Sequence, residues 1–98
     1  MKKNRPYFVS EETMNKDDLQ ISRYVLTPHA WEKLEARQIS KNELDSILKE
    51  PDDVIPQGPK YLLAKNFPGR SDNNLAAVIL KKEDLWIVIT VMVNFQKY

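Results

Sequence analysis

A stretch near the start of the chain combines one proton carrier with two cations. The sequence LTPHAWEKLEARQIS, residues 26–40, holds the only histidine, His29, together with Lys33 and Arg37. The three are spaced by four, so on a helix they share one side. An imidazole can transfer protons near neutral pH and cations can bind phosphate, so this side could handle a phosphate group. The alternative is an ordinary solvated helix face with a structural histidine.

The local sequence predicts a helix that would present these three residues. Thr27 can cap its first turn by accepting a hydrogen bond from a free amide, and Pro28 suits the first helical position. The helix should run from Pro28 to about Gln38. Its apolar face is expected to consist of Ala30, Trp31 and Leu34. Both tryptophans of the chain, Trp31 and Trp86, are therefore predicted to lie in the core.

A second helix is predicted directly after the first. Ser40 and Glu43 have the spacing of a capping box, and Pro51 ends the helical segment. Carboxylates of this helix, such as Glu43 or Asp45, could instead pair with Arg37 and make that cation purely structural. The apolar stripe of this helix is expected to be Leu44, Ile47 and Leu48.

Strand patterns dominate the rest of the chain. Residues 60–67, 75–82 and 86–95 are strand candidates, residues 21–27 can add a short one, and PGRSDNN forms a loop. We therefore predict an α+β fold in which two N-terminal helices pack on a three- to four-stranded antiparallel sheet. Because the last strand is apolar on both faces, a homodimer, an antitoxin-like partner or residues 1–20 could cover the second face.

Composition limits the function classes further. The chain has 98 residues, enough for one small domain, and it lacks cysteine, which excludes disulfides and thiolate sites. A net charge of +1 is not the global basicity of a DNA-coating protein. Residues 1–20 should form a flexible tail before a single domain at 21–98. Since LWIVITVMV is about half the length of a membrane helix, we expect a cytoplasmic protein without membrane partner or cofactor.

Three segments carry a family resemblance that covers about residues 24–95. LTPHAWEKLEARQIS, LKEPDDVI and IVITVMV are similar to motifs of the family catalogued as domain of unknown function 4258. The matches in the first segment are His29, Ala30, Glu32, Arg37, Ile39 and Ser40. Lys33 stands where arginine is usual, and Gln38 replaces a glycine, which suggests a different helix ending. The order of elements also resembles RelE- and BrnT-type toxins, a group that contains metal-independent ribonucleases.

The resemblance implies candidate roles in RNA cleavage without a metal. His29 would carry the proton, Arg37 would stabilise the charge on phosphorus, and Thr90 would donate a hydrogen bond from the last strand. The candidate phosphate-binding residues are Lys33, Lys60, Lys65 and Arg70. The alternative is a non-catalytic protein- or nucleic-acid-binding module on the same scaffold. Of the functional hypotheses, a metal site on His29 and Glu32 has the least support, because a competent site needs about three protein ligands.

Overall fold

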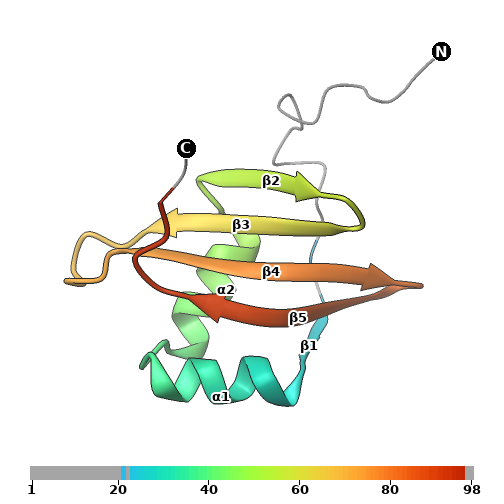
Figure 1. Cartoon of the computed structure of the whole chain (residues 1–98), viewed down its shortest axis with the longest axis horizontal. Coiled ribbons are helices and arrows are strands. Elements are labelled where there is room, and N and C mark those ends of the chain that lie inside the picture. Colours follow the sequence, from blue (N-terminus) through green and yellow to red (C-terminus); the bar gives the residue numbers. More distant parts are fainter. Residues whose placement is uncertain (1–20, 22, 97–98) are drawn as a thin grey trace, which may run out of the picture.

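The computed structural model describes residues 21 and 23–96; the predicted tail, residues 1–20, lies outside them. One five-stranded sheet in the order β1-β5-β4-β3-β2 forms the centre of the domain, and α2 lies behind it in Figure 1. Along the chain the elements are β1 (Tyr24–Leu26), α1 (Pro28–Ala36), α2 (Lys41–Lys49), β2 (Asp53–Gln57), β3 (Lys60–Asn66), β4 (Asn74–Lys82) and β5 (Leu85–Met92). The α+β class is therefore confirmed.

The sheet differs from the prediction in strand number and direction. β2, β3, β4 and β5 pair antiparallel, but β1 pairs parallel with β5, with Tyr24 opposite Trp86. Because β1 precedes both helices, the helices connect the two edge strands of the sheet, β1 and β2, and are not N-terminal. The prediction missed β2 because Pro56 lies inside it. An edge strand tolerates proline, since one side of its backbone needs no ladder hydrogen bond.

Side-chain caps start both helices as predicted. The Thr27 hydroxyl accepts from the Ala30 amide at 3.0 Å and donates to the Ile89 carbonyl at 3.0 Å, so one side chain caps α1 and ties it to β5. Ser40 and Glu43 form the expected capping box, with reciprocal hydrogen bonds of 3.1 and 2.9 Å. The predicted starts are confirmed because capping is a local property.

The end of α1 corrects the expectation for Gln38. This residue has φ 55°, the left-handed conformation that normally favours glycine. Its amide donates to the Glu35 carbonyl at 3.2 Å, and the Ile39 amide donates to the Leu34 carbonyl at 2.9 Å. Leu34 and Ile39 are both buried, so an apolar contact accompanies the turn. Gln38 thus takes the backbone conformation that a glycine would take, and the helix ending need not differ.

The two faces of the sheet are covered unequally. Both helices contribute to the main core on one face, which is closed by buried side chains such as Leu44, Ile47 and Leu63. The opposite face contains no helix residue in its apolar cluster, and we call it the uncovered face because no helix of the described residues packs on it. Its members are the buried residues Leu62, Ala64 and Ala76 and the half-buried residues Ile55, Val78, Met92 and Phe95. β5 contributes to both clusters, with Trp86, Val88 and Val91 on the helix side and Met92 on the other.

Candidate functional site

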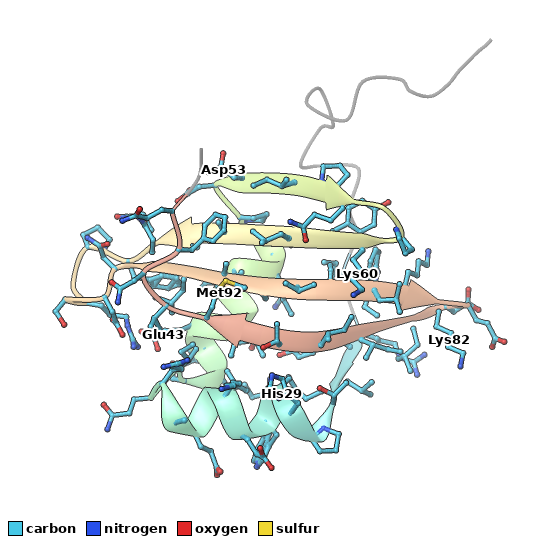
Figure 2. The ribbon with its side chains drawn as sticks, viewed as in Figure 1. His29, Glu43, Asp53, Lys60, Lys82 and Met92 are labelled. Atoms are coloured by element: carbon cyan, nitrogen blue, oxygen red, sulfur yellow. The ribbon has the colours of Figure 1, made fainter. Side chains whose placement is uncertain are left out.

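His29 and Lys33 of α1, together with its C-cap residue Arg37, form what we call the basic flank. Ala30 and Leu34 of the same helix point into the core. The amide of Thr27 donates to the Val88 carbonyl at 3.1 Å, so α1 begins beside the middle of β5. Figure 2 shows His29 on the side of α1 that faces β5.

The basic flank is chemically available. His29 and Arg37 are exposed and Lys33 is half-buried. Among the described residues, none of these three side chains has a hydrogen-bond or ion-pair partner. The alternative pairing of Arg37 with Glu43 or Asp45 is not observed in the described structure, where Arg70 binds Glu43 and both Tyr24 and Lys41 bind Asp45. The flank is therefore an open row of donors at successive helical turns, about 6 Å apart along the axis.

Thr90 lies on the uncovered face, where it pairs with Val78 across β4 and β5. A register shift next to this pair separates Thr90 from the Ile79–Val88 pair and places Ile89 in a bulge. Within the part of the chain that the structure describes, no hydrogen bond joins the Thr90 side chain to the basic flank. Thr90 therefore lies on the uncovered face, and Thr90 and His29 do not form an enclosed site together.

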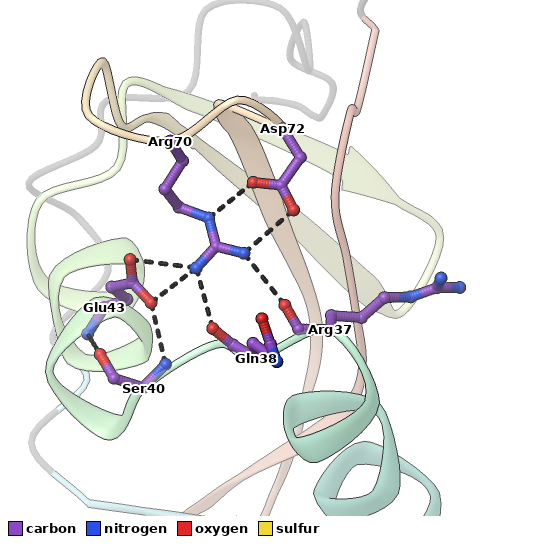
Figure 3. Close-up of polar contacts among 6 residues, drawn as sticks. All are labelled: Arg37, Gln38, Ser40, Glu43, Arg70 and Asp72. Carbon is purple, nitrogen blue, oxygen red and sulfur yellow. Dashed lines mark hydrogen bonds and ion pairs between the residues drawn. The ribbon is translucent and has the colours of Figure 1, made fainter.

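Arg70 is a structural cation (Figure 3). From the β3–β4 loop its guanidinium donates to Asp72 at 2.7 and 3.0 Å and to Glu43 at 3.0 and 3.2 Å. It also donates to the carbonyls of Arg37 and Gln38 at 3.0 and 2.9 Å. The five N–H groups of a guanidinium are then all engaged, and the side chain is only 18% exposed. Arg70 has no donor left for an added phosphate and instead holds the α1–α2 corner to the loop.

These contacts shift the ionisation of their partners. The Arg70 hydrogen bonds lower the pKa of Asp72 below its ordinary value. Burial alone would raise the pKa of Glu43, but the Ser40 amide and Arg70 together bring it below its ordinary value. The carboxylates in turn raise the pKa of Arg70. The corner is consequently a fixed ion-pair network with two stable anions.

The remaining predicted phosphate ligands lie in different places. Lys65 donates to the Glu50 carbonyl at 2.8 Å and so ties β3 to the end of α2. Lys60 begins β3, is exposed and pairs with Leu80 of β4 on the uncovered face. Neither lies on α1, and only Lys33 belongs to the basic flank. The sequence could not separate these cases, because it does not show whether a carbonyl accepts a hydrogen bond from a given lysine.

Sequence reasoning missed a second feature, a groove of about 600 Å³ beside β1. We call it the β1 groove; it is lined by residues 23–26, by Trp31, Leu34 and Glu35 of α1, and by Ile39, Lys41 and Leu44. Trp86 is 7% exposed, as expected, but Trp31 is 55% exposed and lies in this groove, so its core assignment was wrong. Residue 31 is rotated by about 100° from Ala30 on the helix, away from the buried Ala30–Leu34 line.

One wall of the β1 groove is a polar cluster. The Tyr24 hydroxyl donates to Asp45, and the Lys41 ammonium lies 3.3 Å from the other Asp45 oxygen and 5.9 Å from the Tyr24 ring centroid. Burial and the contact with Asp45 raise the pKa of Tyr24. The hydrogen bond from Tyr24, with help from Lys41, lowers the pKa of Asp45. The Lys41–Asp45 pair has the i,i+4 spacing of a helical ion pair, but the contact with Tyr24 has no signal in the sequence, since β1 and α2 meet only in the fold.

Comparison with known proteins identifies the family. The family model described as domain of unknown function (DUF4258) matches residues 26–93, from the end of β1 to just beyond β5. No curated protein and no solved structure matches the chain. None of the helices in the described residues is long and apolar enough to cross a membrane. Since the match spans α1, α2 and four of the five strands, the chain belongs to the DUF4258 family.

Proposed function

We propose that the protein binds the phosphate backbone of RNA through the basic flank of α1. The single observation that carries this proposal is the state of His29, Lys33 and Arg37: three donors on successive turns, with no partner among the described side chains. Other cations of the domain, such as Arg70 and Lys65, have acceptors. A planar guanidinium beside an ammonium is a common arrangement for phosphate.

The uncovered face next to the flank is aliphatic. Its apolar cluster contains one aromatic residue, Phe95, whereas proteins that stack bases usually offer several aromatic rings. We therefore assign the contact with RNA to the backbone rather than to the bases, with little sequence preference. A protein layer, a second copy or an antitoxin-like chain, suits the aliphatic face better than nucleotides do.

RNA cleavage at His29 is a second candidate, favoured by the exposed imidazole next to two phosphate-binding cations. In metal-independent cleavage the base removes the 2′-hydroxyl proton, the 2′-oxygen bonds to phosphorus, and the 5′-oxygen leaves with a proton from an acid. The flank supplies the base and the positive charge. The only other side chain of the flank that could give up a proton is the Lys33 ammonium, which is a weak acid at neutral pH. For this reason binding is the better-supported function, and a RelE- or BrnT-type activity depends on the cleavage test.

Binding is tested by fluorescence anisotropy with a labelled oligonucleotide of about 12 uridines, a length within the range of small binding domains. The double variant Lys33→Ala/Arg37→Ala should weaken binding about tenfold or more and flatten the salt dependence, since each lost phosphate contact removes roughly 0.7 from the slope. The matched control is Lys60→Ala/Lys82→Ala, which removes the same charge elsewhere. Equal losses in the two double variants would show that only net charge matters and would overturn the assignment to α1.

Cleavage is tested separately with the same RNA and His29→Ala. If His29 is the base, the purified wild-type protein produces 2′,3′-cyclic phosphate ends in EDTA and the variant does not, while both bind RNA. Intact RNA with both proteins would remove the cleavage candidate and leave the binding proposal standing.

A further inference from the structure

Strand register makes the uncovered face one continuous apolar surface. Val78 of β4 lies at its centre, between Leu62 of β3 and Thr90 of β5. Because side chains alternate along each strand, the register also places the following residues on this face: Val25, Ile55, Ala64, Ala76, Leu80, Ile87 and Met92. Thr90 alone among all these side chains is polar, and none is charged. The centre of the face therefore has the composition of an interface core.

Charged side chains of this face lie at its two ends. Lys60 begins β3 and Lys82 ends β4, so both lie at one end of the sheet, whereas Asp53 begins β2 at the other end (Figure 2). Each of the three is two residues from an apolar member of the face in its own strand, so alternation directs it to this side. Glu83 and Asp84 lie beyond Lys82 in the turn before β5. Lys60 is exposed and has no ion-pair partner in the described structure, so the face has a lysine end and a carboxylate end.

The size of the face suits a small dimer. The strands β2 to β5 lie side by side, which makes the face about 20 Å wide at the usual strand spacing and about 25 Å long at the usual rise per residue. Two such faces in contact would bury roughly 1,000 Å² in total, the lower limit for a specific interface. The expected association is therefore weak and depends on protein concentration.

A second copy suits this face better than residues 1–20 do. That segment contains one apolar run, residues 7–9, which would span only about 10 Å as an extended chain. It joins the described domain at Ile21, which is buried in the main core on the helix side. A second copy, in contrast, supplies an apolar surface of equal size.

The position of the charges selects one arrangement of the two copies. Sheets that pack face to face keep their strand directions within about 30° of each other. A two-fold axis perpendicular to the strands places the lysine end of each copy on the carboxylate end of the other, whereas a parallel axis would bring like ends together. With the perpendicular axis, Asp53 approaches the partner's Lys60, and Val78 in the middle of the face lies near its own counterpart.

We propose that the uncovered face binds a second copy of this chain, sheet against sheet, around a two-fold axis perpendicular to the strands. Val78 and Leu62 form the centre of the interface, and Asp53 pairs with the partner's Lys60 at the rim. The proposal is independent of RNA binding, because the basic flank belongs to α1, which packs on the other side of the sheet. Failure of one proposal leaves the other standing.

Sedimentation velocity of the full-length protein over a range of concentrations measures the association. We expect the mass of one chain, 11.5 kDa, at low concentration and twice that mass at high concentration, with a Tm that rises with protein concentration. A protein that stays monomeric up to millimolar concentration would overturn the proposal and leave residues 1–20 or a different protein as the occupant of the face.

Val78→Lys tests the centre of the interface, because it places two like charges beside the axis. The variant should stay folded, since Val78 is only half-buried in one copy, and should be monomeric at every concentration. The matched control is Trp31→Lys, which changes an exposed hydrophobic residue outside the face and should dimerise as the wild type does. Dimerisation of Val78→Lys, or equal loss in both variants, would overturn the assignment. Met92→Lys on the same face replaces Val78→Lys if that variant does not fold.

Charge reversal at the rim tests the orientation of the copies. Lys60→Asp and Asp53→Lys should each raise the Kd of the dimer about fivefold, because each turns an attractive rim pair into a repulsive one. The double variant should recover most of the loss, since it restores opposite charges. A double variant that dimerises no better than the single variants would exclude the perpendicular axis and with it the proposed interface.

Discussion

Replacing Arg70 with alanine should destabilise the whole domain, because this side chain joins the β3–β4 loop to the α1–α2 corner. The substitution removes hydrogen bonds to Glu43 and Asp72 and to the carbonyls of Arg37 and Gln38. A hydrogen bond to a charged group contributes about 1.5–3 kcal/mol, but the freed acceptors lie near the surface and can be rehydrated. We therefore expect a total loss of about 2–3 kcal/mol, or roughly 10–15 °C in Tm for a domain of this size.

Urea denaturation followed by circular dichroism measures this loss. Arg70→Lys keeps the charge but cannot reach acceptors on several sides, so it should recover less than half of the stability. The control is Arg37→Ala, whose side chain is exposed and should change the unfolding free energy by less than about 0.5 kcal/mol. If Arg70→Ala were as stable as Arg37→Ala, or if lysine restored full stability, the network would not have the structural role that we assign to it.

The same network has a predicted pH dependence. The pKa values of Glu43 and Asp72 are lower in the folded protein than their ordinary values. The folded state then binds fewer protons than the unfolded state, so this stabilisation is complete above the ordinary carboxyl pKa of about 4 and is lost as the pH falls below it. In Arg70→Ala the unfolding free energy should fall less steeply below pH 4, as measured by urea denaturation at several pH values.

Three further substitutions test local features of the fold by thermal denaturation. Gln38→Gly should stabilise the protein by up to about 1 kcal/mol, because glycine adopts the positive φ without strain; a loss of stability would contradict that backbone conformation. Thr27→Val should cost about 1–2 kcal/mol, since it removes both the α1 cap and the hydrogen bond to β5, and an unchanged Tm would contradict the double role. Tyr24→Phe should cost about 1 kcal/mol and raise the pKa of Asp45 toward its ordinary value, which an NMR titration of that carboxyl would follow.

The starts of both helices could be predicted from the sequence because capping depends on residues within one helical turn. Thr27, Pro28 and the Ser40–Glu43 pair specify caps within one turn, and the structure has them as predicted. Three residues of α1 were predicted to face the core, but only two of them, Ala30 and Leu34, are buried. In a helix of nine residues the core takes the Ala30–Leu34 line, and Trp31 falls beside it.

The sheet and the site needed tertiary information. The direction of β1 depends on its pairing with β5, which lies about sixty residues later in the chain, and β2 depends on an edge position that allows Pro56. Arg70 and Lys65 were grouped with the phosphate ligands because sequence shows charge but not acceptors. Asp72 is two residues from Arg70, but Glu43 and the Glu50 carbonyl are more than ten residues away in sequence from the side chains they bind. The availability of His29 and Arg37, by contrast, followed from their spacing opposite the core positions.

The most direct test of the central claim is an NMR titration of the full-length protein with single-stranded RNA at low salt. The account predicts that the largest amide shifts lie in α1, around His29, Lys33 and Arg37, and that they diminish as salt is added. Shifts that are absent, or that concentrate at the β1 groove or the uncovered face while α1 stays unchanged, would contradict it.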